Sequence, residues 1–233
     1  MNNDNETIAA RVSSEFGDKV LRIKSNHNEL AYDVSKENLT DVATALRENN
    51  LFSFEQLIDL CGVDYLTFGS EEWITNSATG SGFSRGVDRK AVILDDADQF
   101  DPKRFCVIYH LLSITNNSRI RLRVFTGTDN PPHVDSVTNI WNSANWFERE
   151  AFDLFGIIFD GHPDLRRLLT DYGFIGHPFR KDFPLVGNVE VLYDEDQGKV
   201  VYKETEIEER TLVPKVIRDD RHYQEKKQGR END

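Results

Sequence analysis

Cysteine is scarce in this chain, and the two that occur, Cys61 and Cys106, lie far apart in the sequence. Iron–sulfur centres and zinc ribbons need thiolates at short, characteristic spacings. The two cysteines therefore exclude a cluster of either kind built from neighbouring thiols. Both lie in apolar stretches, where a free thiol behaves as a small hydrophobic group. We expect unpaired thiols and a reducing compartment.

Long hydrophobic runs are also missing. No apolar stretch approaches the roughly 20 residues that a membrane-spanning helix needs. The first residues, MNNDNETIAARVSSEF, lack the basic start and apolar run of a signal peptide, and they are too acidic for a transit peptide. We expect a soluble protein that reaches a membrane only through a partner.

Positive charge is in deficit. The 233 residues include 28 Lys and Arg against 41 Asp and Glu, a net charge of −13. Such a surface is a poor partner for nucleic acid and for anionic lipid. The length and the 38% hydrophobic content suit one domain with appendages.

Catalytic and nucleotide-binding signatures are not supported by their context. The GxSxG pattern of a serine nucleophile occurs at residues 82–86, GFSRG, but no strand-to-helix pattern surrounds it. The glycine-rich stretch ATGSGFSRGVD, residues 78–88, has no GK[ST] ending and no strand-to-helix context, so it does not match a phosphate-binding loop. It lies inside a long polar excursion over residues 69–103, which we expect to be a surface loop.

The rest of the chain has clear periodicity. Helical spacing occurs over residues 6–16, after Ser35, over 137–141 and over 145–156. Strands are expected at 20–23, 30–34, 63–66, 105–115, 119–126, 189–194 and 199–204. Neighbouring strands at 20–34, 105–126 and 189–204 are expected to pair as hairpins.

The helix over 145–156, NWFEREAFDLFG, contains several local signals. Asn145 followed by Glu148 resembles a capping box. Arg149 and Asp153 stand four residues apart, a spacing that favours an ion pair. Gly156 suits the C-terminal cap.

Regular periodicity ends at Gly161. The segment from Gly161 to Pro184, GHPDLRRLLTDYGFIGHPFRKDFP, repeats Gly-His-Pro and will be called the Gly-His-Pro segment. Each proline favours an extended backbone before it. Because the segment is rich in large apolar residues, we expect it to be extended, ordered and held against something.

Two functional interpretations of this segment are possible. His162, His177, Asp164 and Asp182 could converge on a metal ion, as in a metal-dependent hydrolase. The proline after each histidine and the basic residues nearby argue against that site. Alternatively, Arg166, Arg167, Arg180 and Lys181 pair with acidic groups, either of a partner protein or of this chain itself. A chaperone-like adaptor for several partners is a further alternative.

Two motifs together resemble one family. They are NWFEREAFDLFGIIFDGHPDLRRLL, from Asn145, and GHPFRKDFPL, from Gly176. They are similar to the thirty-kilodalton subunit, also called the C subunit, of NADH–quinone oxidoreductase, respiratory complex I. The similarity extends from about Leu51 to Leu185, whereas the loop at 69–103 contributes little to it.

The resemblance implies an α+β fold of two layers, with helices on one face of a small mixed sheet. An extended C-terminal arm follows. The expected division is a core over residues 1–160, including the loop at 69–103, and a partner-docking arm with a charged tail over 161–233. The end of that tail, residues 218–233, is expected to be mobile unless bound.

The resemblance also implies a function. The complex transfers electrons from NADH through FMN and iron–sulfur centres to quinone, coupled to proton translocation. This chain is expected to be a structural subunit of its peripheral arm, with no cofactor and no catalytic residue of its own. It would contact above all the large D subunit, at the cytoplasmic face of the bacterial inner membrane. The residues expected at that interface are Glu148, Arg149, Asp153, His162, Asp164, Arg166, Arg167, His177, Arg180, Lys181 and Asp182.

Overall fold

A computed structural model describes residues 2–25, 29–69, 101–184, 187 and 189–205. Within the described part, the chain forms two compact units. Of the described residues, one unit contains 2–25, 29–66 and 101–183, and the other contains 67–69, 184, 187 and 189–205. The glycine-rich stretch at 78–88 and the charged tail at 218–233 lie outside the described residues.

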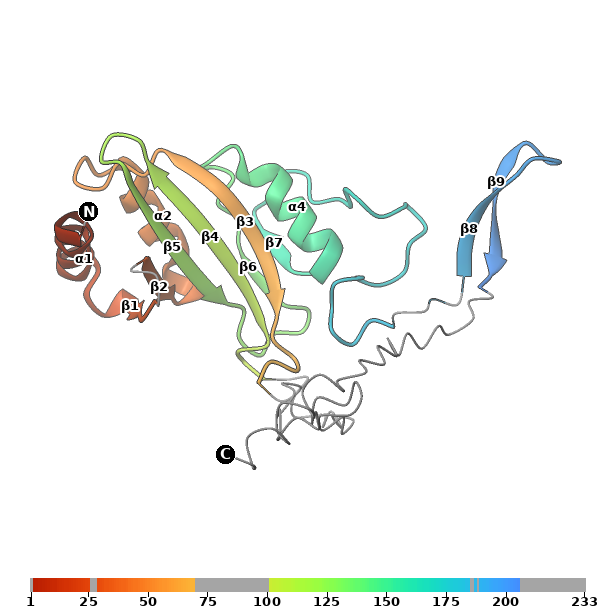
Figure 1. Cartoon of the computed structure of the whole chain (residues 1–233), viewed down its shortest axis with the longest axis horizontal. Coiled ribbons are helices and arrows are strands. Elements are labelled where there is room, and N and C mark those ends of the chain that lie inside the picture. The colour runs from red at the N-terminus through yellow and green to blue at the C-terminus, as the bar shows by residue number, and fades with distance from the viewer. Residues whose placement is uncertain (1, 26–28, 70–100, 185–186, 188, 206–233) are drawn as a thin grey trace, which may run out of the picture. The chain divides into compact units, whose positions relative to one another are not determined.

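The larger unit is built on a five-stranded mixed sheet in the order β1-β2-β5-β4-β3. Its strands are β1 (Val20–Ile23), β2 (Leu30–Val34), β3 (Gln56–Asp64), β4 (Phe105–Ser113) and β5 (Ser118–Phe125). The β1–β2, β4–β5 and β3–β4 pairs are antiparallel, and β2 pairs with β5 in parallel. Figure 1 shows β3, β4 and β5 as the long strands of this sheet.

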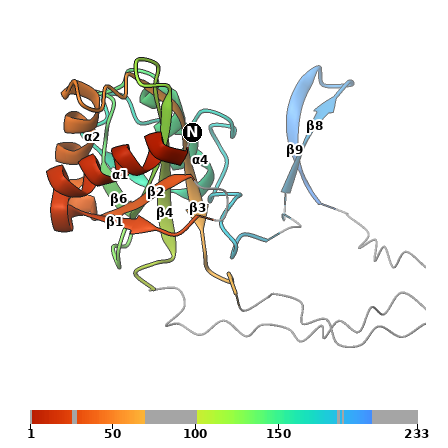
Figure 2. The ribbon, with the colours of Figure 1, turned by 60° about the vertical axis from the view of Figure 1, so that its left-hand side comes forward.

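Helices cover one face of this sheet. They are α1 (Asn2–Phe16), α2 (Leu39–Glu48) and α4 (Ala144–Phe155). Figures 1 and 2 show α2 and α4 on the same side of the sheet. Along β4 and β5 the side chains alternate, and the inward set joins residues of all three helices in one hydrophobic core. The expected two-layer α+β fold is therefore confirmed.

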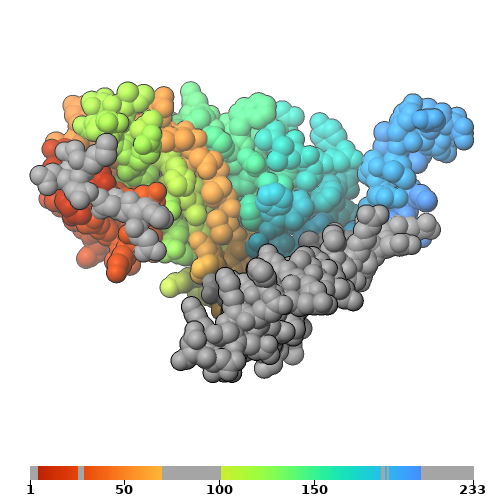
Figure 3. Space-filling model, in the orientation of Figure 1, coloured from red at the N-terminus to blue at the C-terminus, as the bar shows by residue number. Residues whose placement is uncertain are grey.

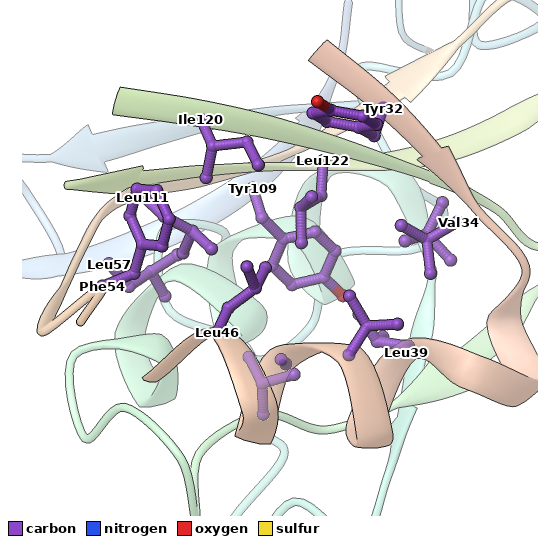
Figure 4. Packing of buried hydrophobic residues seen from close by; sticks show 14 of the residues in the cluster. Tyr32, Val34, Leu39, Leu46, Phe54, Leu57, Tyr109, Leu111, Ile120 and Leu122 are labelled. Carbon is purple, nitrogen blue, oxygen red and sulfur yellow. The ribbon is translucent and has the colours of Figure 1, made fainter. Parts of the chain in front are cut away.

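The core is filled by aliphatic side chains packed around Tyr109. Figure 4 shows Leu39 and Leu46 of α2 pointing toward Tyr109 and Leu122 of the sheet. Leu39, Leu46, Tyr109 and Leu122 each expose 1% or less of their surface. Burial of this kind stabilises a fold by roughly 1.5–3 kcal/mol for each fully buried large side chain. This packed core fixes the position of the sheet against which α4 lies.

The outer face of the sheet contains a cross-strand ion pair. Arg123 of β5 donates from Nε and Nη2 to the two carboxylate oxygens of Asp33 in β2, at 2.6 and 2.8 Å. The two residues face one another in the parallel register. This bidentate pair joins the two strands whose connection is longest in sequence.

Two further sheets are small. Strands β6 (His133–Asp135) and β7 (Ile158–Asp160) pair in parallel, on either side of α4 in the sequence. Strands β8 (Val189–Asp194) and β9 (Lys199–Glu204) form an antiparallel hairpin in the second unit. The expected hairpin at 189–204 is thus confirmed, and β6 and β7 were not expected.

Some sequence-based expectations were wrong in detail. Residues 137–141 form a turn and not a helix, and Glu148 binds the backbone N–H of Val137 at its start. The strand expected at 63–66 begins at Gln56, because the apolar residues of 56–64 are distributed over both faces of an edge strand. The compact unit also runs past the boundary expected at residue 160, as far as Phe183. No helix in the described ranges is long and apolar enough to cross a membrane.

Candidate partner-docking site

Helix α4 carries three charged side chains that are almost fully buried. Glu148 and Asp153 expose none of their surface, and Arg149 exposes 7%. Buried charges are costly unless they are paired and hydrogen-bonded. Each of these three side chains meets that requirement, and each does so by binding a segment outside the helix.

Asp153 holds the middle of the Gly-His-Pro segment. One carboxylate oxygen accepts backbone N–H groups from Leu168, Leu169 and Thr170, at 3.0, 2.7 and 2.8 Å. The other accepts the Thr170 hydroxyl and Nη1 of Arg167. Burial opposes ionisation, but the hydrogen bonds from Thr170, Leu169 and Leu168 outweigh it and hold the pKa of Asp153 below its usual value. The carboxylate therefore acts as a charged anchor.

The arginines around this anchor bind the chain's own backbone. Arg149 donates to the carbonyls of Arg166 and Arg167, at 3.1 and 3.3 Å. Arg167 also donates to the carbonyl of Gly176, at 2.9 Å. Arg149 and Asp153 thus hold the same segment at different points, in place of the ion pair expected between them.

Glu148 connects α4 to the loop before it. Its carboxylate accepts from the hydroxyl of Ser136 at 2.6 Å and from the N–H of Val137 at 2.7 Å. Burial raises the pKa of Glu148 to about 7, against the effect of these two hydrogen bonds. The expected capping box with Asn145 is therefore wrong, because Glu148 is engaged elsewhere and α4 begins at Ala144 without a side-chain cap.

The second Gly-His-Pro covers the C-terminal end of α4. A helix leaves its last carbonyls without intrahelical partners. Here three residues of the segment reach these carbonyls. His177 Nδ1 lies 2.9 Å from the carbonyl oxygen of Asp153, and the N–H of Phe179 donates to the carbonyl of Leu154. Arg180 donates to the carbonyl of Phe155 at 2.6 Å. Gly156 ends the helix in the left-handed conformation, as expected. The guanidinium of Arg180 at this end also suits the helix dipole.

A buried ion-pair network fastens the end of the segment. Arg104, 6% exposed, lies between Asp64 of β3 and Asp182, with an Nη2–Oδ2 distance of 2.7 Å to the latter. Asp64 also accepts the backbone N–H of Lys181 at 2.9 Å. Residues 161–183 are thus tied to both the helix and the sheet, and Figure 3 shows their atoms packed against those of α4 and β3.

The two histidines are held apart, each by backbone. His162 Nδ1 accepts the N–H of Asp164 at 3.0 Å, so its Nε2 can donate to the carbonyl of Asn145 at 3.2 Å. His177 instead binds the carbonyl of Asp153. Among the described residues, no group of three or more His, Cys, Asp or Glu could hold a metal ion. The geometry assigns both rings a positioning role.

The segment exposes four large apolar side chains. Leu169, Tyr172, Ile175 and Phe179 are 62%, 94%, 90% and 57% exposed. Five charged residues of the segment are also exposed: Asp171, Lys181, Asp182, and the pair Asp164 and Arg166, whose charged groups lie 2.8 Å apart. Apolar side chains on a segment this firmly fixed form a surface suited to a protein partner. The four residues will be called the apolar surface of the segment.

Sequence reasoning missed three residues that fix this surface. They are Asp64, Arg104 and Thr170. Asp64 and Arg104 carried a weak local signal. Asp64 is a charged residue at the end of an apolar strand, and Arg104 is a charged residue just before another apolar strand. Thr170 carried no signal, since its role depends on the position of Asp153 in space.

Comparison with known proteins identifies the family. Residues 32–189 match the family described as respiratory-chain NADH dehydrogenase, 30 Kd subunit. The C subunit of NADH-quinone oxidoreductase from Hydrogenovibrio crunogenus is 52% identical over 213 residues, covering 91% of this chain and 95% of the relative. The same subunit from Coxiella burnetii is 48% identical over 228 residues, covering 97% and 99%.

One similar solved structure is the trypsin-resistant fragment (1–134) of Nqo5. It is 27% identical, with a TM-score of 0.46, and the match covers 71% of this chain and all of the fragment. The family match spans more than half of the chain, and the two curated relatives are aligned over nearly their full length. The chain therefore belongs to the 30 kDa subunit family of respiratory-chain NADH dehydrogenase, whose members include the C subunits of NADH-quinone oxidoreductase.

Proposed function

We propose that the Gly-His-Pro segment is a preformed surface by which this chain docks on the large D subunit of the complex. The observation that carries the proposal is the orientation of the segment's groups. Arg167, His177 and Arg180 bind the chain's own helix, and Leu169, Tyr172, Ile175 and Phe179 are exposed. Preorganisation of this kind lowers the entropy lost on binding.

In this proposal the chain itself has no catalytic residue and holds no flavin, iron–sulfur cluster or quinone. It serves a complex that couples electron transfer to proton translocation, at the cytoplasmic face of the inner membrane. The wide spacing of Cys61 and Cys106 in the sequence supports the proposal that this chain holds no iron–sulfur cluster, because two such thiols do not match the spacing of cluster ligands. Both are free thiols in the structure.

The proposal changes which residues should contact the partner. Several residues expected at the interface would not touch the partner but would fix the conformation of the segment. They are Arg149, Asp153, Arg167, His177 and Arg180. The exposed charged residues among those expected at the interface are Asp164, Arg166, Lys181 and Asp182. Apolar contact is then the main source of affinity, with Tyr172 and Ile175 at its centre.

The test is co-purification of the complex after replacing Ile175 by aspartate. A charge buried in an apolar interface is strongly unfavourable. We expect Ile175→Asp to reduce the amount of the large D subunit recovered with this chain at least tenfold. The isolated variant should keep its thermal unfolding midpoint, because Ile175 is 90% exposed.

Leu21→Asp is the matched control. Leu21 is 69% exposed on β1, in the same unit but outside the segment, and the same change there should leave assembly unaltered. Normal recovery of the large D subunit with Ile175→Asp would show that the apolar surface does not dock. Equal losses for both variants would show that any added charge disturbs assembly.

A further inference from the structure

The β8–β9 hairpin has an apolar face with little burial. The register places Val191 opposite Tyr202, Tyr193 opposite Val200 and Val189 opposite Glu204, so these side chains share one face, with the one charged residue at its end. Val189, Val191, Tyr193 and Val200 are 57%, 51%, 64% and 58% exposed. These four residues will be called the hairpin face. An isolated two-stranded hairpin is at best marginally stable in water.

The opposite side of the hairpin is built differently. Glu190 stands across from Lys203, and Asp194 stands across from Lys199. Oppositely charged residues in facing positions stabilise a pair of strands. They flank Leu192 and Val201, so this side already carries the mixed pattern of a surface in contact with water. The ribbon is therefore amphipathic, with one side suited to solvent.

We propose that the hairpin face packs on an apolar patch of another subunit of the same complex. This contact is additional to the one made by the Gly-His-Pro segment. The inference rests on the proposed function, because the partner must already be held near this chain. It commits to a partner patch that is apolar at its centre and basic at its rim.

The size of the hairpin determines what kind of partner it can have. Six residues per strand, at about 3.3 Å each and two strands wide at about 4.8 Å, give a footprint of about 20 by 10 Å. A stable independent interface buries about 800 Å² on each partner. The hairpin is too small to hold a free protein, so it fits a subunit that other contacts keep in place.

Charge argues for a different subunit over a second copy of this chain. Each copy carries a net charge of −13, so two copies repel one another. Residues 189–204 contain five acidic and two basic residues, a net of −3. The acidic turn at Asp194, Glu195 and Asp196 borders the hairpin face. A partner with basic groups around an apolar patch complements this pattern.

The test measures the protection of single cysteines in the assembled complex. Val191→Cys places a thiol on the hairpin face, and Leu192→Cys places one on the opposite side. Leu192 is 44% exposed, similar to Val191. Both are made with Cys61→Ser, and Cys106 is buried. Labelling by a charged maleimide is timed in the isolated chain and in the purified complex.

We expect the complex to slow labelling of Val191→Cys at least tenfold and to leave Leu192→Cys unchanged. Equal rates for Val191→Cys in the two samples would overturn the proposal. Protection of both positions would contradict one-sided docking. Protection of Val191→Cys in the isolated chain, with the mass of a dimer, would assign the face to a second copy. These outcomes are separate from the Ile175→Asp test, which alone decides whether the Gly-His-Pro segment docks.

Discussion

At the residue scale, Asp153 is the group on which the Gly-His-Pro segment depends most. A single carboxylate accepts three backbone N–H groups, a hydroxyl and a guanidinium. Because hydrogen bonds hold its pKa down, the stability it contributes is present above the pKa of the unfolded chain. That stability is lost as pH falls toward the lower folded-state pKa.

Asp153→Asn should lower the free energy of unfolding by about 2 to 3 kcal/mol. The amide keeps the shape of the side chain but removes the charge that pairs with Arg167 and turns one acceptor into a donor. Urea unfolding of the isolated chain at neutral pH measures the change. Asp164→Asn is the control, because Asp164 is exposed and pairs with its neighbour Arg166. Equal effects of the two substitutions would contradict the anchor role.

Glu148 should give the opposite dependence on pH. Its pKa is raised from 4.5 to about 7, so the folded chain binds a proton more tightly than the unfolded chain does. The contribution is fully present below about 4.5, and it is lost as pH rises to about 7. Glu148→Gln should remove this decline, since the amide can still accept from Val137 and donate to Ser136. Unfolding midpoints measured from pH 5 to 8 provide the comparison. A wild-type decline that persists unchanged in the variant would refute the assignment.

At the element scale, α4 and the Gly-His-Pro segment meet at Gly156. Its φ is +71°, and an added Cβ would lie 2.5 Å from a ring carbon of His177 and 2.6 Å from Nη2 of Arg180. Gly156→Ala should therefore expose the segment to trypsin at Arg166, Arg167, Arg180 and Lys181. Gly161→Ala is the matched control, because Gly161 has a similar φ of +82° with nothing within 4 Å of an added Cβ. Similar cleavage of both variants would attribute the effect to backbone strain alone.

The elements show how far the sequence predicts the fold. The β4–β5 hairpin followed from alternating residues around Asn116 and Asn117, and the structure confirms it. The parallel β2–β5 pair could not be predicted, because the two strands are far apart in sequence and the link between Arg123 and Asp33 exists only in space. Likewise, the periodicity located α4 and its end at Gly156. It could not indicate that His177 and Arg180 would occupy the last carbonyls of that helix.

At the scale of the whole molecule, the hydrophobic core that the described residues form lies in the larger unit. Every residue of the core cluster falls between Ile8 and Phe159. A chain truncated after Pro184 should therefore unfold at the same urea midpoint as the full chain, with the same cooperativity. Circular dichroism at 222 nm measures both. A midpoint lowered by the truncation would show that residues beyond 184 stabilise the core.

The inward binding of the segment's arginines has a consequence for how the complex responds to salt. Arg149, Arg167 and Arg180 use their donors on this chain's own carbonyls and on Asp153, so these three guanidinium groups are already engaged and are not needed to hold a partner. Screening by salt weakens exposed charge pairs but has little effect on apolar contacts. The docked partner should consequently stay bound in washes of high ionic strength and should be released by chaotropic agents, which weaken apolar burial.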